Sequence, residues 1–369
     1  MYLDNAATTP LKPEVKDYII SLLNTYQNPS SMYRSGVNAK QIINTARKNV
    51  AKFINTNPED IIFTSGGSAN NTLFIKGYTQ KNKCRVLYSP ISHKSVLKCV
   101  ESLKYKCPLR VNYTGKIDLQ DLKERLVMDT IKKFVVIEYA NSEIGTIQNI
   151  KQIVDICHFY NAMIYIDCTG SISQIPIDIK MLNADGIGFS AHKLGALKGT
   201  GVLYKNPSIE LEPLIYGSQE QGLFAGTENT IGIGALGKTI ENYDYSSITS
   251  GNRDYIYDYI KNNIPDSYLV GADLKHRLPH NLYICFKGIQ GESLITLLDM
   301  NGYQVSTGSA CTSGDLQPSS TLLAIGMNKE DIYSCIRITL NGKETKYELE
   351  KFCDLLKHNI EILRNLNGK

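Results

Sequence analysis

Apolar positions along the first two-thirds of the chain follow two alternating spacings. Six segments repeat apolar residues at the three- and four-residue spacing of an amphipathic helix: 14–23, 37–54, 71–78, 95–103, 119–126 and 150–160. Short runs rich in β-branched and aromatic residues lie between and after them: 61–64, 85–88, 134–138, 163–167, 186–189 and 201–204. This alternation predicts an α/β fold in which helices cover both faces of a mostly parallel sheet.

The pattern changes after about residue 250. Buried runs become sparse, a loop of small residues covers 306–314, and an amphipathic segment follows at 346–363. These features predict a smaller α+β domain. We place its boundaries at residues 1–13 and 251–369, beside a large domain of residues 14–250.

The amino-acid composition and net charge limit the kinds of molecule that this protein is expected to bind. The chain has 369 residues, of which 42% are hydrophobic and 21% charged, as in an ordinary globular protein. The 40 Lys and Arg and 36 Asp and Glu leave a net charge of +4, which is too small and too evenly spread to favour nucleic acid or an anionic membrane. No apolar run approaches the roughly 20 residues that cross a bilayer. We therefore expect a soluble protein that acts on small molecules.

The spacing of the cysteines indicates the redox environment in which the protein works. All nine lack a Cys-x-x-Cys partner, and no secretory signal precedes Asp4. This usage predicts mostly buried thiols in a reducing cytoplasm, and no metal site is expected.

An acid and an amine are expected to meet at one edge of the sheet. The apolar run 163–167 ends in Asp167, and the run 186–189 leads to His192 and Lys193. A desolvated Lys193 would be nucleophilic enough to form a Schiff base with a carbonyl cofactor. Asp167 would pair with a protonated pyridine nitrogen. Taken alone, each is more often a surface lysine or a turn cap, so the chemical interpretation depends on both being in register.

Three further positions have both a chemical and an ordinary structural interpretation. Gly67 and Ser68 join a strand to a helix, where backbone N–H groups could bind a phosphate or simply begin a capped helix. His93 could stack on a ring or cap the next helix. Arg337 alternates with apolar neighbours on a strand, and could be an exposed arginine or a clamp for a carboxylate.

Cys311 lies within the nine small residues of the 306–314 loop. Glycine on either side of the thiol predicts a mobile arm rather than a packing element. Such a thiol could attack a bound substrate as a thiolate and carry the product away, whereas the alternative is a turn that holds a buried cysteine.

Together these motifs resemble the NifS/IscS-type cysteine desulfurases, which are class V, fold-type I enzymes that depend on pyridoxal phosphate. The resemblance covers nearly the whole chain and depends on the order and spacing of several segments: 2–10 (YLDNAATTP), 28–31 (NPSS), 63–66 (FTSG), 143–145 (EIG), 192–193 (HK), 226–227 (GT) and 308–313 (GSACTS). It implies a seven-stranded sheet in the large domain, with the small domain carrying Cys311 and Arg337.

The resemblance also implies residue roles. Lys193 would hold the cofactor as an aldimine, Asp167 would contact its ring nitrogen and His93 would stack on its ring. Further cofactor contacts would come from Gly67, Ser68, Ser142, Ser190, His192 and, from a second subunit, Thr227. Arg337 would grip the carboxylate of L-cysteine with Asn141 beside it, and Cys311 would take the sulfur as a persulfide. The implied homodimer releases alanine and passes sulfur to an acceptor protein for iron–sulfur clusters or thiolated tRNA.

The departures from the family pattern gather around the cofactor. Ser142 and Gly170 replace an asparagine and a glutamine near the ring hydroxyl, and each lost hydrogen bond would cost about 1 kcal/mol. The other departures are Gly67-Ser68-Ala69, Thr72, Ala191, Tyr33 and Phe224. Two alternatives therefore stay open. One is another class V reaction, such as selenocysteine lysis, β-elimination or amino transfer; the other is a weakly active paralogue that serves as a binding partner.

Overall fold

The computed structural model describes residues 1–308, 318–366 and 368, and its largest element is a seven-stranded sheet. In spatial order the strands are β1 (Ile61–Thr64), β7 (Gly201–Lys205), β6 (Gly186–Ser190), β5 (Met163–Asp167), β4 (Lys132–Glu138), β2 (Cys84–Tyr88) and β3 (Lys106–Pro108). Neighbours from β6 to β3 pair in parallel, whereas β7 is antiparallel to β1 and β6. The mostly parallel α/β sheet expected from the sequence is confirmed.

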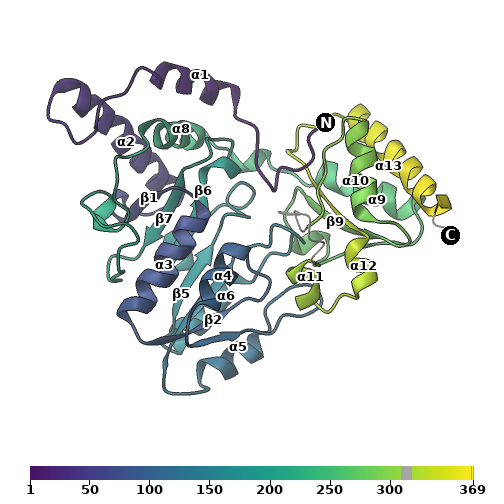
Figure 1. Cartoon of the computed structure of the whole chain (residues 1–369), viewed down its shortest axis with the longest axis horizontal. Helices are drawn as coiled ribbons and strands as arrows, with labels where there is room; N and C mark the ends of the chain where they lie inside the picture. The colour runs from purple at the N-terminus through teal and green to yellow at the C-terminus, as the bar shows by residue number, and fades with distance from the viewer. Residues whose placement is uncertain (309–317, 367, 369) are drawn as a thin grey trace.

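Helices cover both faces of this sheet because its strands present two apolar faces (Figure 1). In β4, Val135 and Ile137 join one buried cluster, while Phe134 and Val136 join another on the opposite face. The first cluster is covered by α2 (Arg34–Phe53), α5 (Leu119–Leu126), α6 (Ile150–Phe159), α7 (Ile179–Leu182) and α8 (Thr230–Glu241). The second is covered by α3 (Gly67–Lys81) and α4 (Lys94–Glu101). The helix α1 (Pro13–Leu22) lies against α8.

A second, antiparallel sheet has the order β10-β9-β8 and its own core. Its strands are β8 (Ser267–Leu269), β9 (Asn281–Phe286) and β10 (Cys335–Thr339). The helices around it are α9 (Gly251–Asn263), α10 (Gly291–Met300), α11 (Ser320–Ala324), α12 (Lys329–Tyr333) and α13 (Lys346–Leu366). Of these, α9, α10 and α13 contribute to the apolar cluster of this sheet.

The N-terminal segment belongs to the small sheet by its contacts. Leu3 is fully buried in that apolar cluster, and Asp4 forms a parallel bridge with Thr339. Both termini lie on this side of the molecule (Figure 1). These contacts support the division into domains expected from the sequence, and its boundaries stay a prediction. None of the helices in the described ranges combines the length and apolar character needed to span a bilayer.

Candidate active site

A pocket of about 270 Å³ lies at the edge of the large sheet where the parallel strands end. Ligands of open α/β sheets bind at this edge. Its lining residues are Ala7, Gly67, Ser68, Asn71, His93, Ser95, Glu138, Ser142, Asp167, Thr169, Gly170, Ser190, His192 and Lys193. The structure therefore brings together eight residues predicted for the site: Gly67, Ser68, His93, Ser142, Asp167, Ser190, His192 and Lys193.

Lys193 ends the short 3-10 turn Ala191–Lys193 that follows β6. Its Nζ donates hydrogen bonds to the carbonyl oxygens of Ala6 and Ala7 in the N-terminal segment. Burial, and then the nearby positive charge of Arg337, lower the pKa of Lys193 to about 8. A larger fraction of this amine than of an ordinary lysine is therefore unprotonated near neutral pH, and the unprotonated amine is the nucleophile for a carbonyl group.

Asp167 ends β5 and is 5% exposed. Its Oδ2 accepts a hydrogen bond from Asn71 Nδ2 at 2.8 Å, and its Oδ1 accepts one from the backbone N–H of Thr169 at 2.9 Å. The Tyr165 hydroxyl donates to Asn71 Oδ1 at 2.8 Å, which turns the amide nitrogen of Asn71 towards Asp167. The carboxylate is therefore held in one orientation.

His93 caps a helix and also reaches the pocket. It is the N-cap of α4, and its Nδ1 accepts a hydrogen bond from the backbone N–H of Ser95 at 3.1 Å. Its ring also lines the pocket. The cap fixes the ring at the pocket wall, so the structural role supports a stacking role.

The turn between β1 and α3 brings the N-terminus of a helix to the pocket. The N–H of Gly67, the first residue of α3, donates to Ser190 Oγ at 2.6 Å. A Cβ atom on Gly67 would lie 2.8 Å from Thr169 Oγ1, so the close approach requires glycine. Thr169 Oγ1 is buried and has no hydrogen-bond partner among the described residues. An orphaned hydroxyl beside a helix N-terminus fits an occupant that carries a phosphate.

His192 lies next to the same end of the pocket. Burial, and then the positive charges of Lys193 and Lys198, lower its pKa to about 4. It is therefore neutral at physiological pH, and its Nδ1 lies 3.1 Å from Thr8 Oγ1. A neutral imidazole can offer one N–H donor to a phosphate without adding charge.

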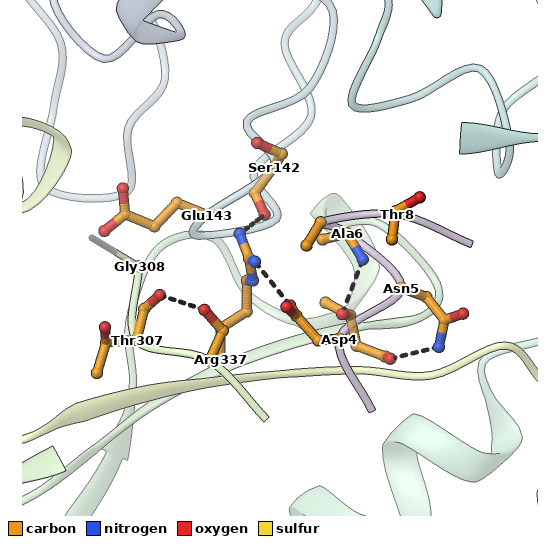
Figure 2. A network of polar contacts seen from close by, with 12 residues as sticks. Asp4, Asn5, Ala6, Thr8, Ser142, Glu143, Thr307, Gly308 and Arg337 are labelled. Carbon is orange, nitrogen blue, oxygen red and sulfur yellow. Dashed lines mark hydrogen bonds and ion pairs between the residues drawn. The ribbon is translucent and has the colours of Figure 1, made fainter. Parts of the chain in front are cut away.

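Arg337 lies against the N-terminal segment, from which Asp4 points towards its guanidinium (Figure 2). Its Nη2 forms an ion pair of 2.8 Å with Asp4 Oδ1, and its Nη1 donates to the carbonyl oxygen of Ser142 at 3.2 Å. Its Nε is buried without a partner in the described part of the chain. The Nε of this guanidinium, which is 8% exposed, is thus free to donate to a carboxylate.

Besides Arg337, two described residues that were predicted for the site do not line the pocket. The Asn141 side chain is 3% exposed, and its Nδ2 donates to Ile91 O at 2.8 Å and to Glu138 Oε1 at 2.7 Å. Its Oδ1 accepts from the N–H groups of residues 143 and 144 at 2.9 and 2.8 Å. These four bonds hold the loop after β4, and the contact of Asn141 with substrate stays a prediction. Thr227 lies on an exposed loop, and Cys311 lies outside the described residues.

Sequence reasoning missed Asn71, Thr169, Asp4 and Glu138. Glu138 ends β4 opposite Asp167 in the sheet register, lines the pocket and is 5% exposed. Burial raises the pKa of Glu138 well above its usual value, and the negative charges of Asp167 and Glu143 raise it further, against the hydrogen bond from Asn141. The sequence feature that could have identified Glu138 is a glutamate inside a buried apolar run, because a buried carboxyl group needs a specific partner.

Glu138→Gln should stabilise the folded chain increasingly as pH rises. The unfolded chain ionises Glu138 above its ordinary pKa of about 4.5, whereas the folded chain keeps the carboxyl neutral, so wild-type stability falls through this window by up to about 1.4 kcal/mol per pH unit. Glutamine retains the acceptor for Asn141 and cannot ionise. Urea unfolding of the apoprotein at pH 5 and pH 8 measures the difference, with exposed Glu124→Gln as control. A stability gain that is the same at both pH values would contradict this expectation.

The comparisons with known proteins agree with this geometry. The aminotransferase class-V family matches residues 1–352. A protein named cysteine desulfurase IscS from Dictyoglomus turgidum is 38% identical over 383 residues, covering 100% of this chain and 96% of the relative. Its namesake from Clostridium botulinum is 36% identical with the same coverage.

Solved structures give the same result. A NifS-like protein superposes with a TM-score of 0.90 at 28% identity, covering 98% of this chain and all of that one. A NifS-like protein from Rickettsia africae gives a TM-score of 0.89 at 30% identity, covering 98% and 99%. The resemblance expected from the sequence is confirmed, and the chain belongs to the aminotransferase class-V family.

Proposed function

We propose that this protein is a pyridoxal phosphate-dependent cysteine desulfurase that converts L-cysteine to L-alanine and leaves the sulfur as a persulfide on Cys311. The observation that carries the proposal is one pocket lined by a depressed-pKa lysine, a fixed carboxylate and a histidine ring: Lys193, Asp167 and His93. Similarity over the full chain to proteins named cysteine desulfurase supports it.

The residues present fit the cofactor. When bound, pyridoxal phosphate supplies an electron sink for a carbanion at the substrate Cα. Lys193 would bind its aldehyde, and the freed Nζ, with a pKa of about 8, could then take and return the Cα proton. Asp167 would hold a proton on the ring nitrogen, since its carboxylate is fixed by Asn71 and Thr169. The donors around Gly67 and Thr169 would bind the phosphate.

The two altered ring contacts lie side by side. A Cβ atom on Gly170 would lie 3.3 Å from Ser142 Cβ and 2.8 Å from the carbonyl oxygen of Ala140. A side chain at 170 would therefore have to displace the loop that carries Ser142. Because residue 170 is glycine, position 142 has room for a longer side chain.

Ser142→Asn should tighten cofactor binding. Asparagine would restore a hydrogen bond to the ring hydroxyl, worth about 1 kcal/mol, which is about fivefold in the dissociation constant. A titration of the apoprotein with pyridoxal phosphate, followed by absorbance, measures the change, and Ser142→Ala serves as the matched control without the donor. Weaker or unchanged binding in Ser142→Asn would show that this contact has not been lost.

We further propose a homodimer, a sulfur-acceptor protein and a cytoplasmic location. The exposed position of Thr227 supports the dimer, because the residue lies away from the pocket of its own chain. The eight described cysteines are all free thiols, which supports a reducing compartment. L-Cysteine, rather than a membrane or a nucleic acid, is the partner proposed for the pocket.

Product analysis tests the proposed function. The purified protein, given pyridoxal phosphate, L-cysteine and a dithiol reductant, should form alanine and sulfide in equal amounts. Cys311→Ser should lose sulfide formation and keep the absorbance of the bound cofactor, whereas Cys107→Ser should keep both. Pyruvate and ammonia in place of alanine would indicate β-elimination. Full activity of Cys311→Ser would overturn the persulfide step, and failure to bind the cofactor would favour a binding partner.

A further inference from the structure

Two cysteines face each other across the small sheet, outside the pocket. Strands β9 and β10 pair antiparallel with Cys285 opposite Cys335. The N–H of Phe286 donates to the carbonyl oxygen of Ser334 at 2.9 Å, so 286 and 334 form a hydrogen-bonded pair. The adjacent pair of Cys285 and Cys335 is therefore of the non-hydrogen-bonded type, in which the Cα atoms are about 4.5 Å apart and the side chains approach most closely.

The two thiols converge on one point. Cys335 Sγ lies 3.1 Å from the carbonyl oxygen of Asp331, and Cys285 Sγ lies 3.6 Å from the same oxygen. A disulfide spans Cα separations of about 4.4–6.8 Å, which includes the separation expected for this type of strand pair. The backbone register therefore already suits a cross-strand bond, and both cysteines are free thiols in this structure.

The surroundings make the two sulfurs chemically unequal. A hydrogen bond from Cys335 lowers the pKa of Cys285, against the effect of burial, and a hydrogen bond from Tyr268 lowers it further. The same contact between the thiols, followed by burial, raises the pKa of Cys335. The contact between the thiols therefore favours the thiolate at Cys285 over the thiolate at Cys335.

Other cysteines in strands lack this arrangement. In the large sheet, Cys84 lies opposite Lys132 and Cys107 lies opposite Leu87. Cys353 is also fully buried, but it lies on α13, and burial raises its pKa to about 12. The close approach of Cys285 and Cys335 thus depends on their opposite positions in the two strands and not on burial alone.

We propose that Cys285 and Cys335 are a redox pair that closes to a disulfide when the protein meets a peroxide. The Cys285 thiolate attacks hydrogen peroxide and becomes a sulfenic acid, and the Cys335 thiol then displaces water from that sulfur. In total, two S–H bonds break, one S–S bond forms, and one peroxide is reduced to two waters. A dithiol reductant reverses the reaction.

The pair lies close to groups that support the pocket. Arg337 and Tyr283 form the next non-hydrogen-bonded pair of the same two strands, on the same face as the cysteines. The Tyr283 hydroxyl lies 3.1 Å from Glu143 Oε1 and accepts from the N–H of Gly308 at 3.2 Å. The disulfide would therefore form one pair away from the arginine proposed to bind substrate.

Peptide mapping tests the redox pair without any activity measurement. The holoprotein carrying Cys311→Ser, so that the loop thiol does not compete, is treated with hydrogen peroxide, alkylated and digested without reduction. We expect the chain to lose two alkylatable thiols and to give one cross-linked peptide that joins Cys285 and Cys335, and dithiothreitol to restore both thiols. Recovery of both residues alkylated, oxidised to sulfinic acid, or linked to other cysteines would overturn the proposal.

Matched variants test which cysteines form the cross-linked peptide. Cys353→Ala should retain the cross-linked peptide, and Cys335→Ala should abolish it and leave Cys285 as a sulfenic acid that dimedone traps. Oxidation of the wild-type cysteines in guanidinium should lose the preference for this pair, because the sheet no longer holds them opposite each other. Equal preference in the unfolded chain would show that the fold does not direct the bond. None of these readouts depends on desulfurase activity, so the two proposals can fail separately.

Discussion

Lys193→Ala should abolish both covalent capture of pyridoxal phosphate and desulfuration of L-cysteine. Among the residues that the structure describes, no other lysine lines the pocket, and the Nζ of Lys193 combines burial with a pKa lowered to about 8. Loss of the nucleophile and of the base for the Cα proton should reduce kcat/KM by more than about 1,000-fold, or about 4 kcal/mol in the activation free energy. Steady-state kinetics with alanine as the measured product gives this value.

Two further variants test whether Lys193 acts as a nucleophile, rather than through its positive charge or through the stability of the fold. Lys193→Arg keeps a positive charge but cannot form the covalent link, so it should lose as much activity as the alanine variant. Lys198→Ala removes an exposed lysine five residues away and should leave kcat/KM within about twofold. Substantial turnover by Lys193→Arg would mean that the lysine acts only through its charge.

Asp167→Asn should lower kcat by at least about 100-fold, or about 2.7 kcal/mol, because the neutral amide cannot stabilise a proton on the ring nitrogen. The carboxylate also accepts from two donors, Asn71 Nδ2 and the N–H of Thr169, at 2.8 and 2.9 Å. An asparagine can accept from only one of them, since its own NH2 group would face the other. Some loss of cofactor affinity should therefore accompany the loss of kcat.

The comparison of kcat with cofactor affinity tests this role. At saturating pyridoxal phosphate, Asp167→Asn should remain slow, whereas a variant with only a binding defect would recover. Asp178→Asn, which alters the cap of α7, should retain wild-type kcat and serves as the control for general destabilisation. If the kcat of Asp167→Asn returned to the wild-type value at high cofactor concentration, Asp167 would have only a structural role.

The parts of the fold that were predictable follow from apolar periodicity. The six strands expected in the large sheet are present because each is a short apolar run buried on both faces. Strand β3 was missed because it has only three residues, two of them exposed. Helix α8 was missed because its many glycines disfavour a helix locally. A Cβ on Gly237 would lie 2.7 Å from Ala46 Cα, so the close packing of α2 against α8 requires glycine at this position. The same glycine lowers the helix propensity of the segment and makes the helix hard to predict from the sequence.

The site was predictable to the extent that its residues stand at strand ends and in recognisable motifs. Lys193 and Asp167 belong to that group, and they meet in the pocket as expected. Asn71 and Thr169 could not be found from the sequence, because their roles come from neighbours far along the chain. The hydrogen bonds of Asn141 could not be predicted for the same reason, since an amide next to a conspicuous motif gives no sign of the four backbone and side-chain groups that contact it.

Borohydride reduction of the holoprotein followed by peptide mapping shows directly which lysine binds the cofactor. Reduction fixes pyridoxal phosphate to the amine that binds it, and the label is then located by mass spectrometry. We predict one pyridoxyl group per chain, on the peptide that contains Lys193. A label on a different lysine, or no label after incubation with excess cofactor, would contradict the account of this pocket.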